Sequence, residues 1–367
     1  MVNVQFFADP ARLFGVASEA GPLGTAVLAG VSALFSGKFY ILFSALFGYG
    51  FVLLWNAVHE RGRDVAPVAL RRFAMLFVLG LSHAILLFTG DILVTYAVAG
   101  ALMLMCRNVS IRAARRTAIA IWIAMCAVLL LLTGVLALTE PLLAGDPMLR
   151  EALQGPTGAQ ASITDSPASY LAFNASLYPQ TLASLVFGQG PIALAMFFLG
   201  LAAGKARLLE RGVPVSTLKR IVVVGLCIGL PGAAFTGWAA ELAGSLTGTL
   251  AAYAAATATG PFLTAAYVAA LLLWFRSPSG AGARDVLAPA GRMALSNYLG
   301  QSLVLALLFT GYGLALADRV HPLGVTGIVL VVFGCQLAIS RWWLTGHRYG
   351  PVEWLLRFVT YAGRTAR

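Results

Sequence analysis

A histidine and an aspartate lie close together in a stretch of the chain that is otherwise almost entirely apolar. His83 lies within residues 72–88, and Asp91 follows that stretch after Thr89 and Gly90. An ionisable group inside a membrane span is energetically costly, so one that is present is a candidate for function. We expect a neutral His83 imidazole to act as a general base toward a hydroxyl or an amine. The alternative is a histidine that only forms a hydrogen bond to a neighbouring helix.

Asp91 also has two interpretations. Its carboxylate can cap the helix that follows and complement the dipole of that helix. Alternatively, it orients a histidine or binds substrate. Along one straight helix, eight residues separate His83 from Asp91 by about 12 Å, so a direct contact is not expected without a bend or a water molecule. His83 and Asp91 are therefore the catalytic candidates.

A second set of polar residues lies near the C-terminus. Arg292, Asn297 and Gln301 recur at helical spacing, and Gln336 lies at a similar depth in the next apolar stretch. This stripe could line a cavity open to the cytoplasm, where Arg292 would meet the phosphates of an acyl-coenzyme A donor. Hydrogen bonds between helices explain the amides equally well.

The remaining charged residues and the cysteines suggest structural roles. Lys38 is expected to be solvated or to snorkel on the outward side, and Glu353 is expected to pair with Arg357 one helical turn later. The four cysteines show no spacing typical of metal ligands. Because no phosphate-binding loop, zinc-protease motif or nucleophile elbow is present in the sequence, we expect neither a metal nor a bound cofactor.

The composition of the chain indicates the environment of these residues. Of its 367 residues, 59% are hydrophobic and only 11% are charged, which is typical of a membrane protein. The net charge of +11 comes from Lys and Arg in short clusters between apolar stretches. This pattern indicates topology and argues against a nucleic-acid partner, so the expected partner is the lipid bilayer.

Apolar stretches of suitable length predict an all-α, polytopic transmembrane helical bundle of about nine to ten spans. The predicted spans are 40–55, 72–88, 91–106, 117–138, 185–204, 219–240, 260–275, 291–312 and 323–342. We expect one transmembrane domain over residues 1–367.

Loops rich in basic residues alternate along the chain with loops that are nearly bare of them, and this alternation predicts the orientation. The loops rich in Lys and Arg are placed in the cytoplasm, together with the tail at 343–367. The longest intervening loop, 139–184, carries four acidic residues and one arginine and is placed outside. Residues 1–39 are expected to contain the remnant of a first helix and a short re-entrant or interfacial helix.

Four blocks of sequence form a recognisable set: residues 36–51 (SGKFYILFSALFGYGF), His83 with residues 90–93 (GDIL) and Tyr96, residues 290–298 (AGRMALSNY) with Gln301, and residues 349–357 (YGPVEWLLR). Together they resemble a YeiB-like family of uncharacterised bacterial membrane proteins that is grouped with the membrane acyltransferase superfamily. Members of that family usually begin with one further transmembrane helix, of which only the ending Val2-Asn3 is visible here. Adding such a helix would give about ten spans.

The resemblance implies an acyltransferase of the bacterial inner membrane. It would move an acyl group from a cytoplasmic donor to an envelope glycan or lipid, and it adds Tyr298 to the expected substrate-binding residues. A transporter for a small or amphipathic solute is the alternative, because Gly-Pro interruptions at 188–191 and 229–232 are typical of the broken helices of transporters.

Overall fold

The structure is a computed structural model, and it describes the chain except for residues 1, 15–19, 144–162, 242, 244 and 363–367. The described residues form helices and connecting turns, without strands. The helices are α1 (Val2–Ala8), η1 (Pro10–Phe14), α2 (Gly21–Leu34), α3 (Lys38–His59), α4 (Val65–Leu86), α5 (Leu93–Met105), α6 (Ile111–Leu143), α9 (Pro167–Ser184), η2 (Leu185–Gln189), α10 (Gly190–Lys205), α11 (Leu208–Arg211), α12 (Val215–Glu241), α13 (Leu246–Phe275), α14 (Pro278–Arg292), α15 (Ala294–Phe309), α16 (Pro322–Gly346) and α17 (Pro351–Thr360).

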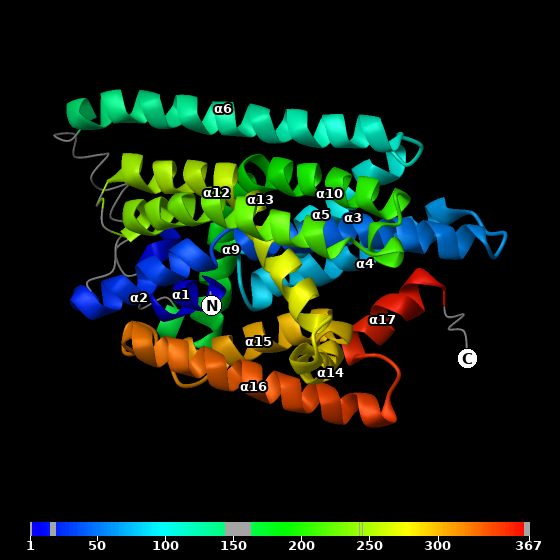
Figure 1. Cartoon of the computed structure of the whole chain (residues 1–367). Coiled ribbons are helices and arrows are strands. Elements are labelled where there is room, and N and C mark those ends of the chain that lie inside the picture. The colour runs from blue at the N-terminus through cyan, green and yellow to red at the C-terminus, as the bar shows by residue number, and fades with distance from the viewer. Residues whose placement is uncertain (1, 15–19, 144–162, 242, 244, 363–367) are drawn as a thin grey trace.

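Most long helices run alongside one another, with α6 along one edge of the bundle and α16 along the opposite edge (Figure 1). Within the described residues, seven helical stretches are long and apolar enough to cross a membrane, and α5 and α15 are shorter apolar helices. Each of the nine predicted spans overlaps one of these helices. The prediction of an all-α polytopic bundle is confirmed, and the chain is a multi-pass membrane protein.

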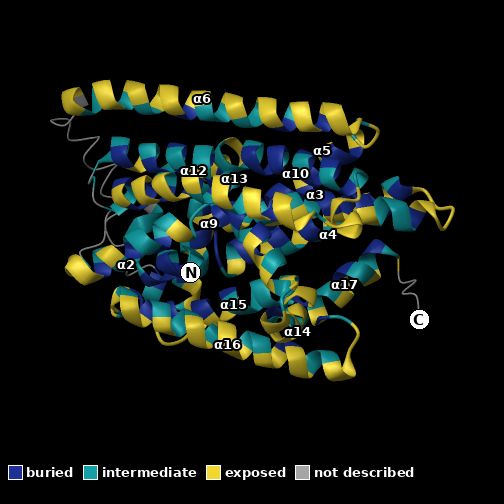
Figure 2. Cartoon of the chain, in the orientation of Figure 1, coloured by how far each residue is buried: buried dark blue, intermediate teal, exposed yellow. Residues whose placement is uncertain are grey.

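Burial follows the position of each helix in the bundle. Figure 2 shows α6 and α16 largely exposed, whereas α3, α5 and α10 are buried between their neighbours. The exposed faces of α6 and α16 carry large apolar side chains such as Leu131, which is 67% exposed, and Val331, which is 66% exposed. Such surfaces are suited to lipid rather than to water.

Two segments that were expected to connect or precede spans are helical where the structure describes them. Residues 167–184, expected in an outward loop, form α9, which continues through the single π-turn η2 into α10. The short segment before the first span is α2, which packs against α12, and its re-entrant or interfacial placement stays a prediction. Much of the loop predicted at 139–184 lies outside the described residues.

Glycines allow α3 and α10 to approach at backbone distance. A Cβ atom on Gly48 would overlap the carbonyl of Phe197, and one on Gly200 would overlap the carbonyl of Ala45. Gly200 and Gly204 are four residues apart, the small-residue spacing that brings membrane helices close together. This contact joins α3 and α10 in the centre of the bundle.

We expect Gly48→Ala to lower stability by about 1–3 kcal/mol, because the added methyl group must push α3 and α10 apart. Gly50→Ala is the matched control on the same helix, since a Cβ there meets no atom within 4 Å. Thermal unfolding in detergent measures both variants. Equal unfolding temperatures for the two variants would contradict the close packing.

Candidate active site

His83 and Asp91 form a buried hydrogen-bonded pair, with 2.8 Å between Nδ1 of His83 and Oδ1 of Asp91. The side chains are 1% and 0% exposed, respectively. The bend that such a contact requires is present, because α4 ends at Leu86 and the chain folds back before α5 begins. The backbone amides of Leu87 and Phe88 both bond to the carbonyl of His83, which closes α4 one turn after the histidine.

Asp91 is held in place by three donors. Besides His83, the amide of Val94 donates to Oδ2 at 3.0 Å, and the Tyr298 hydroxyl donates to Oδ1 at 3.3 Å. The aspartate therefore caps α5 and orients the histidine at the same time, so both interpretations of Asp91 apply. Gly80 of α4 makes room for the carboxylate, because a Cβ there would lie 2.6 Å from Oδ2.

The second nitrogen of His83, Nε2, is buried and forms no hydrogen bond with any described residue. An ionised carboxylate can only accept hydrogen bonds, so the shared proton is assigned to Nδ1 and the lone pair of a neutral ring to Nε2. The ring lies 4.9 Å from that of Tyr298 and 6.5 Å from that of Phe88, measured between centroids. A buried polar atom without a partner is uncommon and calls for an explanation, which a catalytic role would supply.

Side chains from other helices support the turn that brings the pair together. The last carbonyls of α4 lack partners within the helix and would be costly to bury. Asn174 donates to the carbonyl of Ile85 at 3.2 Å. Tyr312 and Tyr170 donate to the carbonyls of Leu86 and Leu87 at 2.8 and 2.5 Å, respectively. Sequence reasoning missed these residues, although Tyr170 and Asn174 have the four-residue spacing of one helical face.

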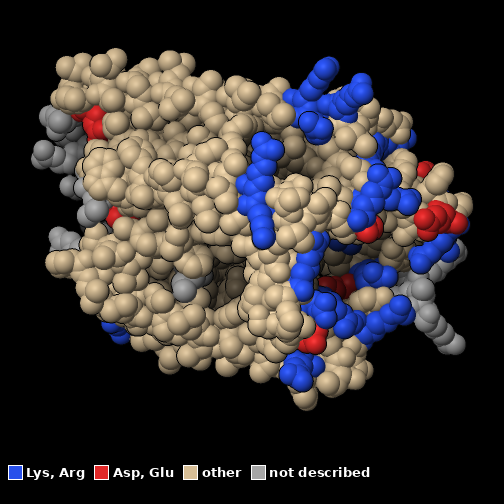
Figure 3. All heavy atoms as spheres, viewed as in Figure 1, with Lys and Arg blue, Asp and Glu red and all other residues tan. Residues whose placement is uncertain are grey.

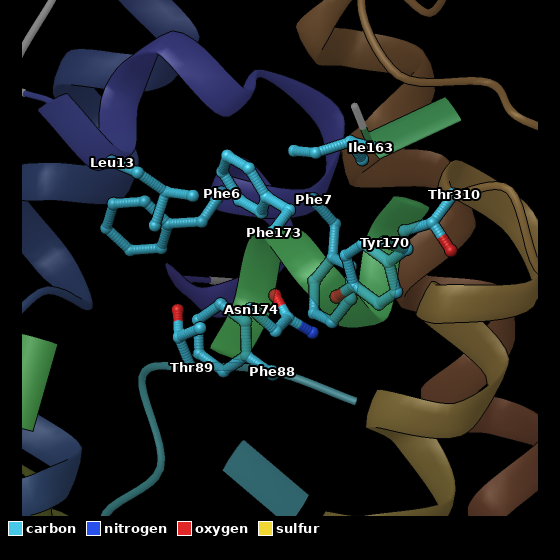
Figure 4. A pocket seen from close by; sticks show the side chains of 10 residues that line it. All are labelled: Phe6, Phe7, Leu13, Phe88, Thr89, Ile163, Tyr170, Phe173, Asn174 and Thr310. Atoms are coloured by element: carbon cyan, nitrogen blue, oxygen red, sulfur yellow. The ribbon is translucent and has the colours of Figure 1, made fainter. Parts of the chain in front are cut away.

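A narrow crevice adjoins this turn (Figure 4). It has an empty volume of about 250 Å³, part of which is open to solvent. Half of its lining residues are aromatic, and a few carry polar groups; the lining residues are Phe6, Phe7, Leu13, Phe88, Thr89, Ile163, Tyr170, Phe173, Asn174 and Thr310. Phe88 and Thr89 lie between His83 and Asp91 in the sequence, so the crevice reaches the segment that joins the pair.

The other predicted substrate-binding residues have different surroundings. Asn297 donates to Ser340 at 3.0 Å, and Gln336 donates to the carbonyl of Asn297 at 2.7 Å, so both amides join α15 to α16. Arg292 is exposed and donates to the carbonyl of Arg348 at 2.9 Å. Gln301 is half-buried on α15. Of the predicted set, Tyr298 alone contacts the His83–Asp91 pair.

Lys38 is buried, contrary to the expectation that it is solvated. It is 2% exposed and lies at the break between α2 and α3, where Gly37 has a φ of 81°. Its ammonium group is 3.5 Å from the carbonyl of Ser32, close to the end of α2. The prediction for Lys38 failed because a break between two helices inside the bundle looks like a loop in the sequence. Among the described residues, no group of three or more acidic, histidine or cysteine side chains is arranged to hold a metal ion.

Comparison with known proteins relates the chain to proteins that are themselves named as uncharacterised. Residues 203–363 match the family described as "Protein of unknown function (DUF418)". The chain is 30% identical to YxaH of Bacillus subtilis, over 88% of the chain and 79% of YxaH. It is 29% identical to YeiB of Escherichia coli, over 88% of the chain and 81% of YeiB. A 39.9 kDa protein from Bacillus acidopullulyticus is 27% identical over 88% of the chain and 80% of that protein. No solved structure gives a significant match.

We expect the neutral imidazole of His83 to carry its proton on Nδ1. Nuclear magnetic resonance of the protein labelled with ¹⁵N in its histidine rings measures this, and the signal lost in His83→Gln identifies the residue. Asp91→Ala should remove the preference, because the carboxylate acceptor is gone. Asp64→Ala is the control, since Asp64 caps the other end of α4. A proton on Nε2 in the unmodified protein would contradict the assigned pair.

Proposed function

The chain belongs to the family of YxaH and YeiB, and we propose that it is a membrane-embedded acyltransferase in which His83 is the general base. The single observation that carries this proposal is the orientation of the imidazole. Asp91 binds Nδ1, and Nε2 is buried without a partner. This is the arrangement by which histidine removes a proton from a hydroxyl or amine.

The proposed acyl transfer follows from the position of the lone pair on Nε2 of His83. Nε2 of His83 takes the proton of the acceptor hydroxyl as its oxygen attacks the acyl carbon of a thioester. A carbon–oxygen bond forms, the carbon–sulfur bond breaks, and the imidazolium returns the proton to the leaving thiolate. Asp91 stabilises the imidazolium that forms between these two steps. The acceptor supplies its own nucleophile, so no serine or cysteine is needed beside His83.

The two substrates would approach from opposite sides of the membrane. Lys and Arg gather at the end of the molecule that holds the α3–α4 turn, the α5–α6 turn and α17 (Figure 3). Basic segments stay in the cytoplasm of bacteria, so this end and the C-terminus would face the cytoplasm of an inner-membrane protein. An acyl-coenzyme A donor would enter there. The acceptor, an envelope glycan or lipid, would enter by the crevice over Phe88 and Thr89.

A transporter is the second candidate, because two helical stretches are interrupted inside the bundle. The break between α2 and α3 holds the buried Lys38, and η2 interrupts the path from α9 to α10. Transporters bind their substrates at interruptions of this kind, where backbone groups are free of helical hydrogen bonds. In that case a solute would cross the membrane without covalent change.

We expect His83→Gln to slow acyl transfer by about 10²- to 10⁴-fold, the usual contribution of a positioned general base. The assay uses the full chain in liposomes prepared with envelope extract and supplied with labelled acetyl-coenzyme A. His59→Gln is the control, because His59 is exposed at the end of α3 and should leave the rate unchanged. Undiminished transfer by His83→Gln would overturn the proposed role. Solute flux without any label transfer, lost in Lys38→Met, would favour the transporter.

A further inference from the structure

We propose that α1 and η1 form a lid over the crevice beside His83, and that an ion pair between Arg12 and Glu241 holds the lid closed. The lid supplies three of the side chains that line the crevice (Figure 4), those of Phe6, Phe7 and Leu13. The other lining residues belong to separate segments, which include the α4–α5 turn and α9. Movement of α1 and η1 would therefore widen the crevice and leave the His83–Asp91 pair in place.

The need for movement follows from the burial of His83. Its side chain is 1% exposed, and Nε2 is buried. An acceptor must contact Nε2 in the proposed reaction, so the inference of a moving lid rests on the proposed function. Around the crevice, α9 and α15 have 18 and 16 residues, and the α4–α5 turn holds the pair itself. In contrast, α1 and η1 have only seven and five residues, so their displacement breaks the fewest helical contacts.

Aromatic rings connect the lid to His83. The ring of Phe7 stacks on that of Phe88, with 5.0 Å between centroids and 25° between planes, and the ring of Phe6 lies 6.2 Å from that of Phe88. Phe88 in turn meets the His83 ring edge-on, at 6.5 Å between centroids. Both Phe7 and Phe88 are buried, so the closed lid keeps water away from this side of the turn.

The ion pair that holds the lid is buried and two-pronged. The Arg12 guanidinium donates to both carboxylate oxygens of Glu241, at 3.1 Å to Oε1, and Ser32 of α2 donates to the same oxygen at 2.9 Å. The side chains of Arg12 and Glu241 are 14% and 5% exposed. Two-pronged, charge-assisted pairs are among the strongest hydrogen-bonded contacts in proteins. Arg12 lies in η1 and Glu241 is the last residue of α12, so the pair fastens the lid to the bundle.

Ion pairs between distant segments are rare in this protein. Within the described residues, Arg12 and Glu241 form the only arginine–carboxylate pair whose partners are more than three residues apart. The pair expected between Glu353 and Arg357 does not form, because Glu353 instead accepts from two amides at the start of α15. Removal of one partner from a buried pair leaves the other charge uncompensated. A single substitution at Arg12 is therefore expected to shift the lid toward its open form.

Labelling of a cysteine in the crevice measures how often the lid opens. The full chain is placed in phosphatidylcholine nanodiscs, with Thr89→Cys in a background whose four native cysteines are alanine. The probe is an anionic methanethiosulfonate. We expect Arg12→Gln to be labelled about 10- to 100-fold faster, the loss of a charge-assisted hydrogen bond. Arg319→Gln is the matched control, because Arg319 is exposed in the α15–α16 turn and its substitution removes the same charge.

The sign of the charge makes this comparison sharp. Loss of a positive charge slows the approach of an anionic probe, so faster labelling of Arg12→Gln must come from opening. Equal labelling of Arg12→Gln and Arg319→Gln would overturn the proposal. If Arg12→Gln does not fold, Arg12→Lys decides the matter. It keeps the charge but loses the two-pronged contact, so it should still be labelled several-fold faster than Arg319→Gln, and equal rates would again overturn the proposal.

A disulfide across the lid tests its part in the reaction. The Asp318 amide donates to the Ala8 carbonyl at 2.7 Å, which brings the two backbones close enough for a disulfide. With Ala8→Cys and Asp318→Cys in the same background, oxidation should abolish acyl transfer and a reductant should restore it. Undiminished transfer by the oxidised protein would overturn the lid. Labelling does not depend on acyl transfer, so a lid that opens in a protein without transfer would contradict the proposed function and support the lid.

Discussion

The structure depends on one constraint, that a helix ending inside a membrane protein must have its free backbone groups bound by other parts of the protein. Helix α5 has 13 residues and a length of about 20 Å, so it is shorter than a hydrocarbon core of about 30 Å. The α4–α5 turn is therefore buried within the bundle. Three side chains bind the last carbonyls of α4, and Asp91 binds the first turn of α5. The aspartate that satisfies this constraint also holds His83.

Charged side chains also bind free backbone groups at other helix ends. Glu140 of α6 accepts from the amides of Leu246 and Thr247, at 2.9 and 3.0 Å, and so caps α13. Lys205 of α10 donates to the carbonyls of Arg107 and Val109, at 2.8 and 2.6 Å, just after α5. Lipid competes with protein for the apolar surfaces of helices, so apolar packing alone does not fix how two helices are placed. The few charged residues join the helices at defined positions.

The sequence was sufficient to predict the nine apolar spans as helices, because a span must be apolar over the thickness of the bilayer and the bilayer requires an internally bonded backbone. It also identified His83, Asp91 and Tyr298 as separate candidates. Their contact could not be predicted from spacing, since it arises from a turn whose path is determined by Tyr170, Asn174 and Tyr312 from distant segments. For the same reason Asn297 and Gln336 looked like a cavity lining but join two helices. Lys38 was misplaced because a Gly at positive φ inside the bundle and a Gly in a loop have the same appearance in a sequence.

The central claim is that His83 and Asp91 act as one catalytic unit, and a double-mutant cycle on acyl transfer tests it most directly. If Asp91 acts only by orienting and stabilising His83, then Asp91→Asn should slow transfer in the unmodified protein but should have little further effect once His83 is glutamine. The account predicts that the double variant is about as active as His83→Gln alone. Independent effects, in which the two losses multiply in the double variant, would contradict it.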